Sequence, residues 1–217
     1  MKRTLTLLST ALSLSLVLGT SRSLADTISF QLTVGNPPVA PFAGPYVDVL
    51  VDRSSATSAM ITFTSLSNGS ETFLLGDGSS AAVNVNAALW SVSALSGTNA
   101  GIGFAPGPFS DGGSGTVDGF GDFNQRIDIF DGFTHTVNTL EFLLTNLSGA
   151  WGSAADVLAP NASGLLAAAH LFVADCASAA SCNQADGALA TGFASTPEPA
   201  SALLLGLGLL GLAARRR

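Results

Sequence analysis

Short runs of alternating polar and apolar residues, separated by turn-forming residues, constrain the fold of this chain more than any other feature. Residues 27–34 (Thr-Ile-Ser-Phe-Gln-Leu-Thr-Val) alternate without a break, as in a strand with one buried face, and Asn-Pro-Pro at 36–38 ends the run. Similar runs predict strands at residues 46–51, 59–65, 72–75, 82–86, 89–95, 126–130, 136–145 and 169–174. The sequence therefore predicts an all-β domain, an antiparallel β-sandwich that is jelly-roll-like.

Three stretches depart from this strand pattern. Residues 96–110 contain four Gly and two Pro and predict a long surface loop. Residues 153–158 and 162–168 are rich in Ala and Leu and predict short helical turns. Pro160 and Gly164 limit each of these turns to a few residues, because neither is tolerated well inside a helix.

The N-terminus has the features of a secretory signal. A Lys-Arg pair precedes an apolar run over residues 5–18, and Ser-Leu-Ala at 23–25 provides the small residues that signal peptidase recognises. We expect residues 1–25 to form a signal helix. Cleavage is predicted between Ala25 and Asp26.

The last twenty-one residues combine a proline-rich turn, a hydrophobic stretch and a basic end. The three parts are Pro197, Glu198 and Pro199, then fifteen small or apolar residues at 200–214, and then Arg215, Arg216 and Arg217. A bilayer core needs ~20 apolar residues, so this hydrophobic helix is short for a permanent span. Basic residues at both extremes favour the cytoplasm, which leaves everything between them exported.

The order and chemistry of these three parts resemble the PEP-CTERM sorting signal of Gram-negative bacteria. In that family an exosortase recognises the Pro-Glu-Pro motif and removes the tail during export. The resemblance implies signal peptidase and exosortase as partners, transient association with the inner membrane, and release to the cell surface or beyond. It divides the chain into a signal peptide (1–25), an exported domain (26–196) and a sorting tail (197–217).

The body is also similar to a recurring, uncharacterised group of exported PEP-CTERM proteins. The similar segments are residues 118–124, 127–133, 151–158 and 161–173, which contain Asp-Gly-Phe-Gly-Asp-Phe-Asn and Ile-Asp-Ile-Phe-Asp-Gly-Phe. This similarity implies a β-rich exported domain. It brings no catalytic residues.

The exported body is strongly acidic. Residues 26–196 contain two arginines against twelve aspartates and two glutamates, a net charge of −12. Such a body repels nucleic acid and anionic membrane surfaces, so we expect no nucleic-acid partner. The charge favours solubility, with divalent cation binding as the alternative.

Six oxygen-bearing side chains cluster in a glycine-rich segment. They are Asp111, Asp118, Asp122, Asn124, Asp128 and Asp131. Oxygen ligands on flexible backbone suit Ca²⁺, although the spacing matches neither an EF-hand nor a nonapeptide calcium repeat. The cluster predicts either a loose Ca²⁺ site or, as the favoured alternative, a set of Asp-Gly turns. No other cofactor is expected.

The remaining chemistry does not point to an enzyme. His135 and His170 lack metal-binding spacing, and His170 stands in an apolar run typical of a structural histidine. No Gly-x-Ser-x-Gly nucleophile elbow occurs, and the exported body contains no lysine. The predicted protein is therefore non-catalytic.

The two cysteines, Cys176 and Cys182, predict a disulfide that closes a small loop. An exported chain passes through an oxidising compartment, which favours pairing of an even number of cysteines. A two-cysteine metal site is the alternative. No neighbouring His and no second Cys pair is present to complete the four ligands of such a site.

The resemblance also implies a role, because PEP-CTERM proteins as a class are associated with polysaccharide production and biofilm or floc formation. The first expectation is a structural or adhesion component of the exopolysaccharide or biofilm matrix. The second is a carbohydrate-binding module, with Trp90, Trp151 and Tyr46 as candidate stacking residues. A secreted hydrolase that uses carboxylates ranks last.

Overall fold

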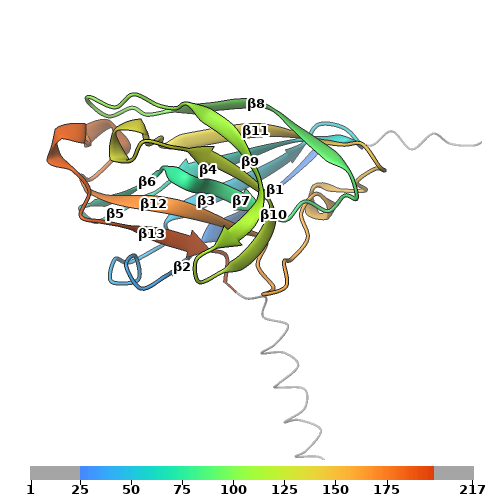
Figure 1. The fold of residues 1–217 in the computed structure, drawn as a ribbon, viewed down its shortest axis with the longest axis horizontal. Coiled ribbons are helices and arrows are strands. Elements are labelled where there is room, and N and C mark those ends of the chain that lie inside the picture. The colour runs from blue at the N-terminus through green and yellow to red at the C-terminus, as the bar shows by residue number, and fades with distance from the viewer. Residues whose placement is uncertain (1–24, 198–217) are drawn as a thin grey trace, which may run out of the picture.

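Two antiparallel β-sheets packed face to face make up the body of the protein (Figure 1). The computed structural model describes residues 25–197, so the predicted signal helix and the predicted C-terminal hydrophobic helix lie outside the described residues. The strands are β1 (Asp26–Leu32), β2 (Val34–Gly35), β3 (Val47–Arg53), β4 (Ser58–Ser65), β5 (Ser67–Asn68), β6 (Glu71–Leu75), β7 (Asp77–Val83), β8 (Trp90–Thr98), β9 (Phe109–Val117), β10 (Gly121–Ile129), β11 (Thr139–Asn146), β12 (Ala167–Asp175) and β13 (Ala190–Ser195). Four 3₁₀ turns join them: η1 (Phe133–His135), η2 (Ala154–Asp156), η3 (Ala179–Ser181) and η4 (Gln184–Asp186).

The first sheet has the order β1-β3-β4-β11-β8. The second has the order β2-β13-β12-β7-β10-β9, with β6 also paired to β12 and β5 paired to β6. Every pair of strands in the two sheets is antiparallel. The predicted antiparallel β-sandwich is confirmed. Across residues 25–197, no helix is long and apolar enough to cross a membrane.

The core lies between the two sheets and follows from the alternation in the sequence. Alternate residues of β3 and β11 point inward and are fully buried, while their neighbours face outward. The first sheet contributes, among others, Val47, Val49, Val51, Ile61, Phe63, Leu140, Phe142 and Leu144. The second contributes Phe73, Leu75, Ala81, Val83, Ile127, Ile129, Leu171 and Val173. Because one face of every central strand is apolar, the pairing register of the strands places all of these apolar side chains in the core together.

Strand β9 was not predicted, because its sequence is dominated by Gly and Ser. The structure explains the glycines by the side chains of the neighbouring strand β10. A Cβ at Gly115 would lie 2.5 Å from Cζ of Arg126, and a Cβ at Gly112 would overlap the carboxylate of Asp128. Glycine therefore leaves space for the Arg126 and Asp128 side chains against the edge strand, which overrides its poor strand propensity.

Other differences from the sequence prediction are local. The predicted strand at 82–86 overlaps only the end of β7. Strand β7 begins earlier, at the Asp-Gly pair that the sequence predicted as a turn. Asp77 and Ser79 at its start both have positive φ, at 64° and 63°. Strand β13 was not predicted either. The helical turn predicted at 153–158 is the single 3₁₀ turn η2, and the one predicted at 162–168 is an irregular turn that leads into β12.

Candidate functional site

The C-terminal end of the sandwich is where the body meets the Pro-Glu-Pro motif. Strand β13 ends at Ser195, which is fully buried, and Thr196 is 5% exposed. The backbone N–H of Thr196 donates to Ala167 O at 3.2 Å, and Leu166 N–H donates to Thr196 Oγ1 at 3.2 Å. Pro197 is exposed and follows directly. The folded body is thus hydrogen-bonded up to the residue before the motif.

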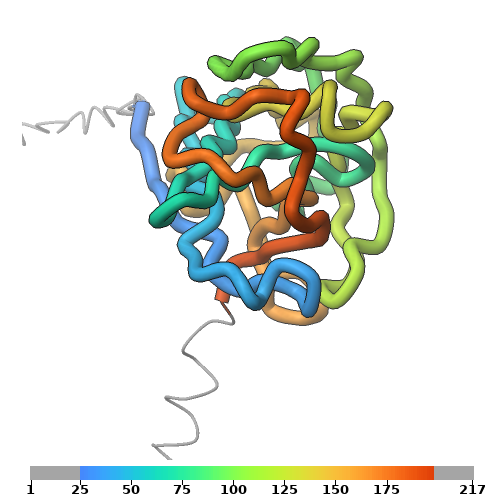
Figure 2. Tube along the Cα trace, turned by 90° about the vertical axis from the view of Figure 1, so that its left-hand side faces the viewer, coloured from blue at the N-terminus to red at the C-terminus, as the bar shows by residue number. Residues whose placement is uncertain are grey.

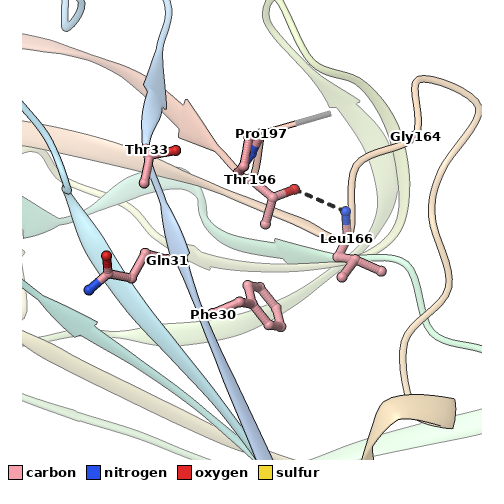
Figure 3. A pocket seen from close by; sticks show the side chains of 7 residues that line it. All are labelled: Phe30, Gln31, Thr33, Gly164, Leu166, Thr196 and Pro197. Atoms are coloured by element: carbon pink, nitrogen blue, oxygen red, sulfur yellow. Dashed lines mark hydrogen bonds between the residues drawn. The ribbon is translucent and has the colours of Figure 1, made fainter. Parts of the chain in front are cut away.

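Two pockets adjoin this exit point. One of about 380 Å³ is shown in Figure 3 and is lined by Phe30, Gln31, Thr33, Gly164, Leu166, Thr196 and Pro197. The other, of about 320 Å³, shares Thr196 and is lined by Val34, Gly119, Phe120, Ser163, Leu165 and Thr196. We call the residues of both pockets the tail-exit face. All of them are uncharged, in contrast to a body that carries −12.

The predicted signal-cleavage junction lies elsewhere on the sandwich. Figures 1 and 2 both place the start of β1 far from the point where the C-terminal end leaves. The Asp26 carboxylate accepts hydrogen bonds from Arg53 Nε at 2.6 Å and from the Ala154 backbone N–H at 2.8 Å. The Ala154 N–H lowers the pKa of Asp26 most and the Arg53 guanidinium lowers it further, so the pKa lies below its usual value although desolvation opposes the shift.

The first residue after the expected cut is therefore part of the fold. Arg53 is 3% exposed, so its ion pair with Asp26 links the expected start of the body to the interior of the protein. Ala25, on the other side of the expected cut, is exposed. The position of the cut itself remains a prediction.

The six residues predicted as Ca²⁺ ligands are dispersed over β9, β10 and the turns that flank β10. Within the described part of the chain, no three His, Cys, Asp or Glu side chains are grouped so that they could hold a metal ion. Ca²⁺ binding by these residues stays a prediction. Asp111 lies on β9, Asp118 in the following turn, Asp122, Asn124 and Asp128 on β10, and Asp131 just after it.

Neighbouring donors explain what four of these side chains do instead. Asp111 Oδ1 accepts from Gly113 N–H and Gln125 Nε2, and Asp122 Oδ1 accepts from the Thr116 hydroxyl at 2.5 Å. The Asn124 side chain accepts a hydrogen bond from the Val85 N–H and donates one to the Val85 carbonyl. Asp128 accepts from the Ser79 N–H at 2.7 Å. Asp128 is only 5% exposed. These residues satisfy turns and a β-bulge, as the alternative interpretation predicted.

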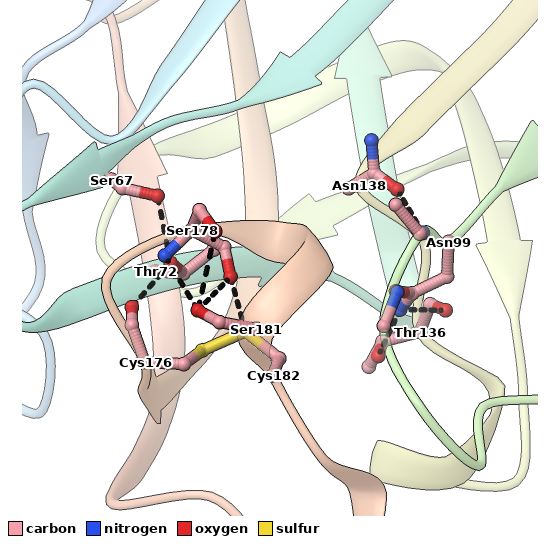
Figure 4. The surroundings of a disulfide bond; sticks show 11 residues. Ser67, Thr72, Asn99, Thr136, Asn138, Cys176, Ser178, Ser181 and Cys182 are labelled. Atoms are coloured by element: carbon pink, nitrogen blue, oxygen red, sulfur yellow. Dashed lines mark hydrogen bonds between the residues drawn. A yellow bond between two sulfur atoms is a disulfide. The ribbon is translucent and has the colours of Figure 1, made fainter.

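The predicted disulfide between Cys176 and Cys182 is present, with the two Cα atoms 5.0 Å apart (Figure 4). It anchors a loop to the end of the second sheet. The Thr72 hydroxyl donates to Cys176 O at 2.6 Å, and the Ile102 N–H donates to Cys182 O at 2.8 Å. The disulfide therefore closes the loop after β12, and these two hydrogen bonds tie its cysteines to β6 and to the loop after β8.

A row of aromatic rings on the outer face of the second sheet was not predicted. Adjacent rings in the row have centroids 4.4–5.7 Å apart, and its members are Phe104, Phe133, Phe172, His170 and Phe193. The His170 ring stacks on Phe193, and its Nε2 lies 2.8 Å from the Thr191 hydroxyl. Burial lowers the pKa of His170, although nearby Asp77 opposes the shift. The pairing of β12 with β13 places Phe193 opposite His170, so an unrecognised β13 concealed this contact.

The aromatic residues proposed from the sequence for glycan stacking belong to the interior. Tyr46 and Trp151 are each 3% exposed, and their polar groups donate to backbone carbonyls of Phe42 and Asn86. Trp90 is half-buried and donates from Nε1 to Gln125 Oε1 at 2.9 Å. Their rings fill space beside the core, which is their commoner use.

Comparison with known proteins adds one finding, at the C-terminus. Residues 195–217 match the family model of the PEP-CTERM protein-sorting motif. The match begins inside β13 and includes Pro197, whereas Glu198, Pro199 and the three terminal arginines lie outside the described residues. No curated protein and no solved structure matches the chain.

The motif is the recognition signal of exosortase. It implies export of the protein and a C-terminal sorting signal that anchors it at the membrane. The sequence of residues 197–217, with its Pro-Glu-Pro turn, hydrophobic stretch and basic end, agrees with the family match. The fold agrees as well, because β13 ends at Ser195, just before the motif. The chain thus carries a PEP-CTERM protein-sorting motif at residues 195–217, which implies export and sorting by an exosortase.

Proposed function

We propose that the sorted sandwich is a non-catalytic structural or adhesion component of the exopolysaccharide or biofilm matrix at the cell surface. The observation that carries the proposal is the extent of the fold. Ordered β-structure runs from Asp26, the first residue after the expected signal cleavage, to Ser195, two residues before the motif. The expected product of processing is therefore one folded block, stapled by a disulfide and carrying a net charge of −12.

The charge suits residence among hydrated polymers. A block of this charge resists self-association through repulsion between copies, and it stays soluble at high local concentration. Contact with an acidic polysaccharide needs bridging cations, whereas contact with a neutral one does not. The partner that we propose is the exopolysaccharide of the producing cell.

The test is deletion of the gene, followed by complementation with the full chain or with residues 1–196. We expect deletion to lower the matrix mass retained by cells, and only the full chain to restore it, because only that chain can be sorted. Fractionation should place the protein with the extracted matrix. Recovery of the protein solely from the soluble medium, with matrix mass unchanged by deletion, would contradict the proposal.

A carbohydrate-binding module is a second candidate, favoured by the aromatic row. Phe130 is 51% exposed, and the half-buried His170 ring lies beside the Thr191 hydroxyl and stacks on Phe193. Phe130 and Phe193 would supply stacking surface to a sugar, and the exposed Thr191 would supply a hydrogen-bonding group. A glycan array with residues 26–196 tests this. Binding should fall in Phe130→Ala and Phe193→Ala but not in Leu50→Ala, which removes an exposed apolar side chain from the other sheet.

A further inference from the structure

The tether between the folded body and the membrane-directed segment is short. Ser195 is fully buried in β13, and the apolar run begins at residue 200. Five residues span at most ~18 Å when fully extended. The polar headgroup layer of a bilayer occupies ~6–7 Å of that distance on each side. Once the apolar run enters the membrane, the tail-exit face is therefore held within about 10 Å of the membrane surface.

The Pro-Glu-Pro motif falls within these five residues of the sequence, and its first residue, Pro197, is part of the sandwich surface. Pro197 lines the larger pocket beside Phe30 and Leu166 (Figure 3). An enzyme that grips residues 197–199 needs a surface on both sides of the extended chain. Because the distance between the body and the membrane is short, the enzyme surface that binds residues 197–199 must also contact the body around Pro197.

The chemistry of the tail-exit face fits such a contact. The lining of both pockets is uncharged, and the larger pocket, about 380 Å³, has room for a few protein side chains. The rest of the body carries a net charge of −12, which is repelled by an anionic surface. The uncharged, partly apolar tail-exit face is therefore the part of the body that can approach a neutral surface near the membrane.

We propose that the tail-exit face is a second recognition surface for the exosortase, in addition to the Pro-Glu-Pro motif. The occupant of the larger pocket is an apolar side chain from the exported face of the enzyme. Contact at the pocket fixes the position of residues 197–199 relative to the enzyme, so the folded body contributes to the rate of tail removal.

The experiment measures the rate of tail removal from the full chain in cells that contain the exosortase. One variant carries Thr33→Glu and Ser163→Glu, which place a charge in each pocket at two exposed positions outside the matched motif. The matched control is Ser29→Glu, an exposed residue of β1 that lines neither pocket. We expect the double variant to slow tail removal about tenfold, because a charge buried in the contact is costly, and the control to match the wild type. The melting temperatures of the secreted bodies check that the fold is intact.

A second pair of substitutions separates contact with the enzyme from contact with lipid. Thr33→Lys with Ser163→Lys should slow removal as much as the acidic pair, because either charge is unfavourable in an apolar protein contact. A wild-type rate in the lysine variant, with a slow rate in the glutamate variant, would assign the face to anionic lipid and overturn the proposal. Equal rates in all variants would also overturn it. Failure of the wild type to lose its tail would instead contradict exosortase sorting itself.

Discussion

Asp26 joins the beginning of the exported body to its interior. One carboxylate oxygen accepts from buried Arg53 and the other from the first N–H of η2. Asp26→Asn keeps the shape of the side chain but removes its charge, so we expect a lower melting temperature at neutral pH. The amide nitrogen also cannot accept from the Ala154 N–H.

The pH dependence of this effect has a defined sign. Because the folded protein lowers the pKa of Asp26, the stabilisation is present above the usual carboxyl pKa near about 4 and is lost as pH falls through the lowered value. Urea unfolding of residues 26–196 at pH 7 and at pH 3 measures it. The difference between wild type and Asp26→Asn should be smaller at pH 3 than at pH 7; an equal difference at both values would contradict this account.

His170 provides a second titration, at milder pH. Burial lowers its pKa in the fold, so the unfolded chain takes up the proton first as pH falls below about 6.5. Stability should therefore decline between pH 7 and pH 5. His170→Gln keeps a polar partner for the Thr191 hydroxyl but does not titrate, and we expect it to lose this decline. The same slope in the variant and the wild type would assign the decline to other groups.

At the scale of elements, the sequence predicted most strands because their inward positions are apolar and regularly spaced. It failed where side chains of another element decide the structure. Gly112 and Gly115 form a strand because Arg126 and Asp128 need their space, and Gly192 of β13 allows close approach of Asn36. Such pairings are long-range and leave no local periodicity.

The same limit applies to the candidate sites. The disulfide and the sorting motif are local in sequence and were predicted, whereas the tail-exit face combines β1 with the segments around residues 164 and 196. The candidate Ca²⁺ ligands could not be placed from the sequence for a related reason. They are spread over β9, β10 and the flanking turns, and a β-bulge interrupts the register of β10 between Phe123 and Ile127.

The disulfide should stabilise the second sheet at one end. Closing a loop of six residues contributes about 2–3 kcal/mol in the chain-entropy model. We expect the double substitution Cys176→Ala/Cys182→Ala to lower the free energy of unfolding by about that amount. Thiol titration of the native exported protein should detect no free thiol before reduction. Two titratable thiols in the native protein would show that the bond does not form in the cell.

For the whole molecule, the acidic charge sets the response to ions. The oxygens of Asp111, Asp122 and Asp128 already accept hydrogen bonds from protein donors, so we expect millimolar Ca²⁺ to change the melting temperature no more than Mg²⁺ does. A specific site would instead add ~2.7 kcal/mol at about 100 times its dissociation constant. A rise in melting temperature with Ca²⁺ alone, abolished in Asp118→Asn/Asp122→Asn, would restore the predicted site.

Processing should occur at both ends of the chain. We expect signal peptidase to cut before Asp26 and exosortase to cut at or near residues 197–199, which releases about 171 residues. Intact mass measurement of the surface fraction tests both cuts together. A mature protein that still ends in Arg217 would contradict removal of the tail, and one that begins before residue 26 would move the signal boundary.

The close fit of the fold to both predicted processing junctions limits the distance that one copy of the protein can bridge. A folded chain of about 170 residues has a diameter of roughly 40 Å, and neither end carries a flexible arm within residues 25–197. Two molecules held by one copy therefore lie within about one protein diameter of each other. Bridging to a neighbouring cell would require many copies arranged along a polymer, so its mechanical contribution depends on abundance rather than on reach.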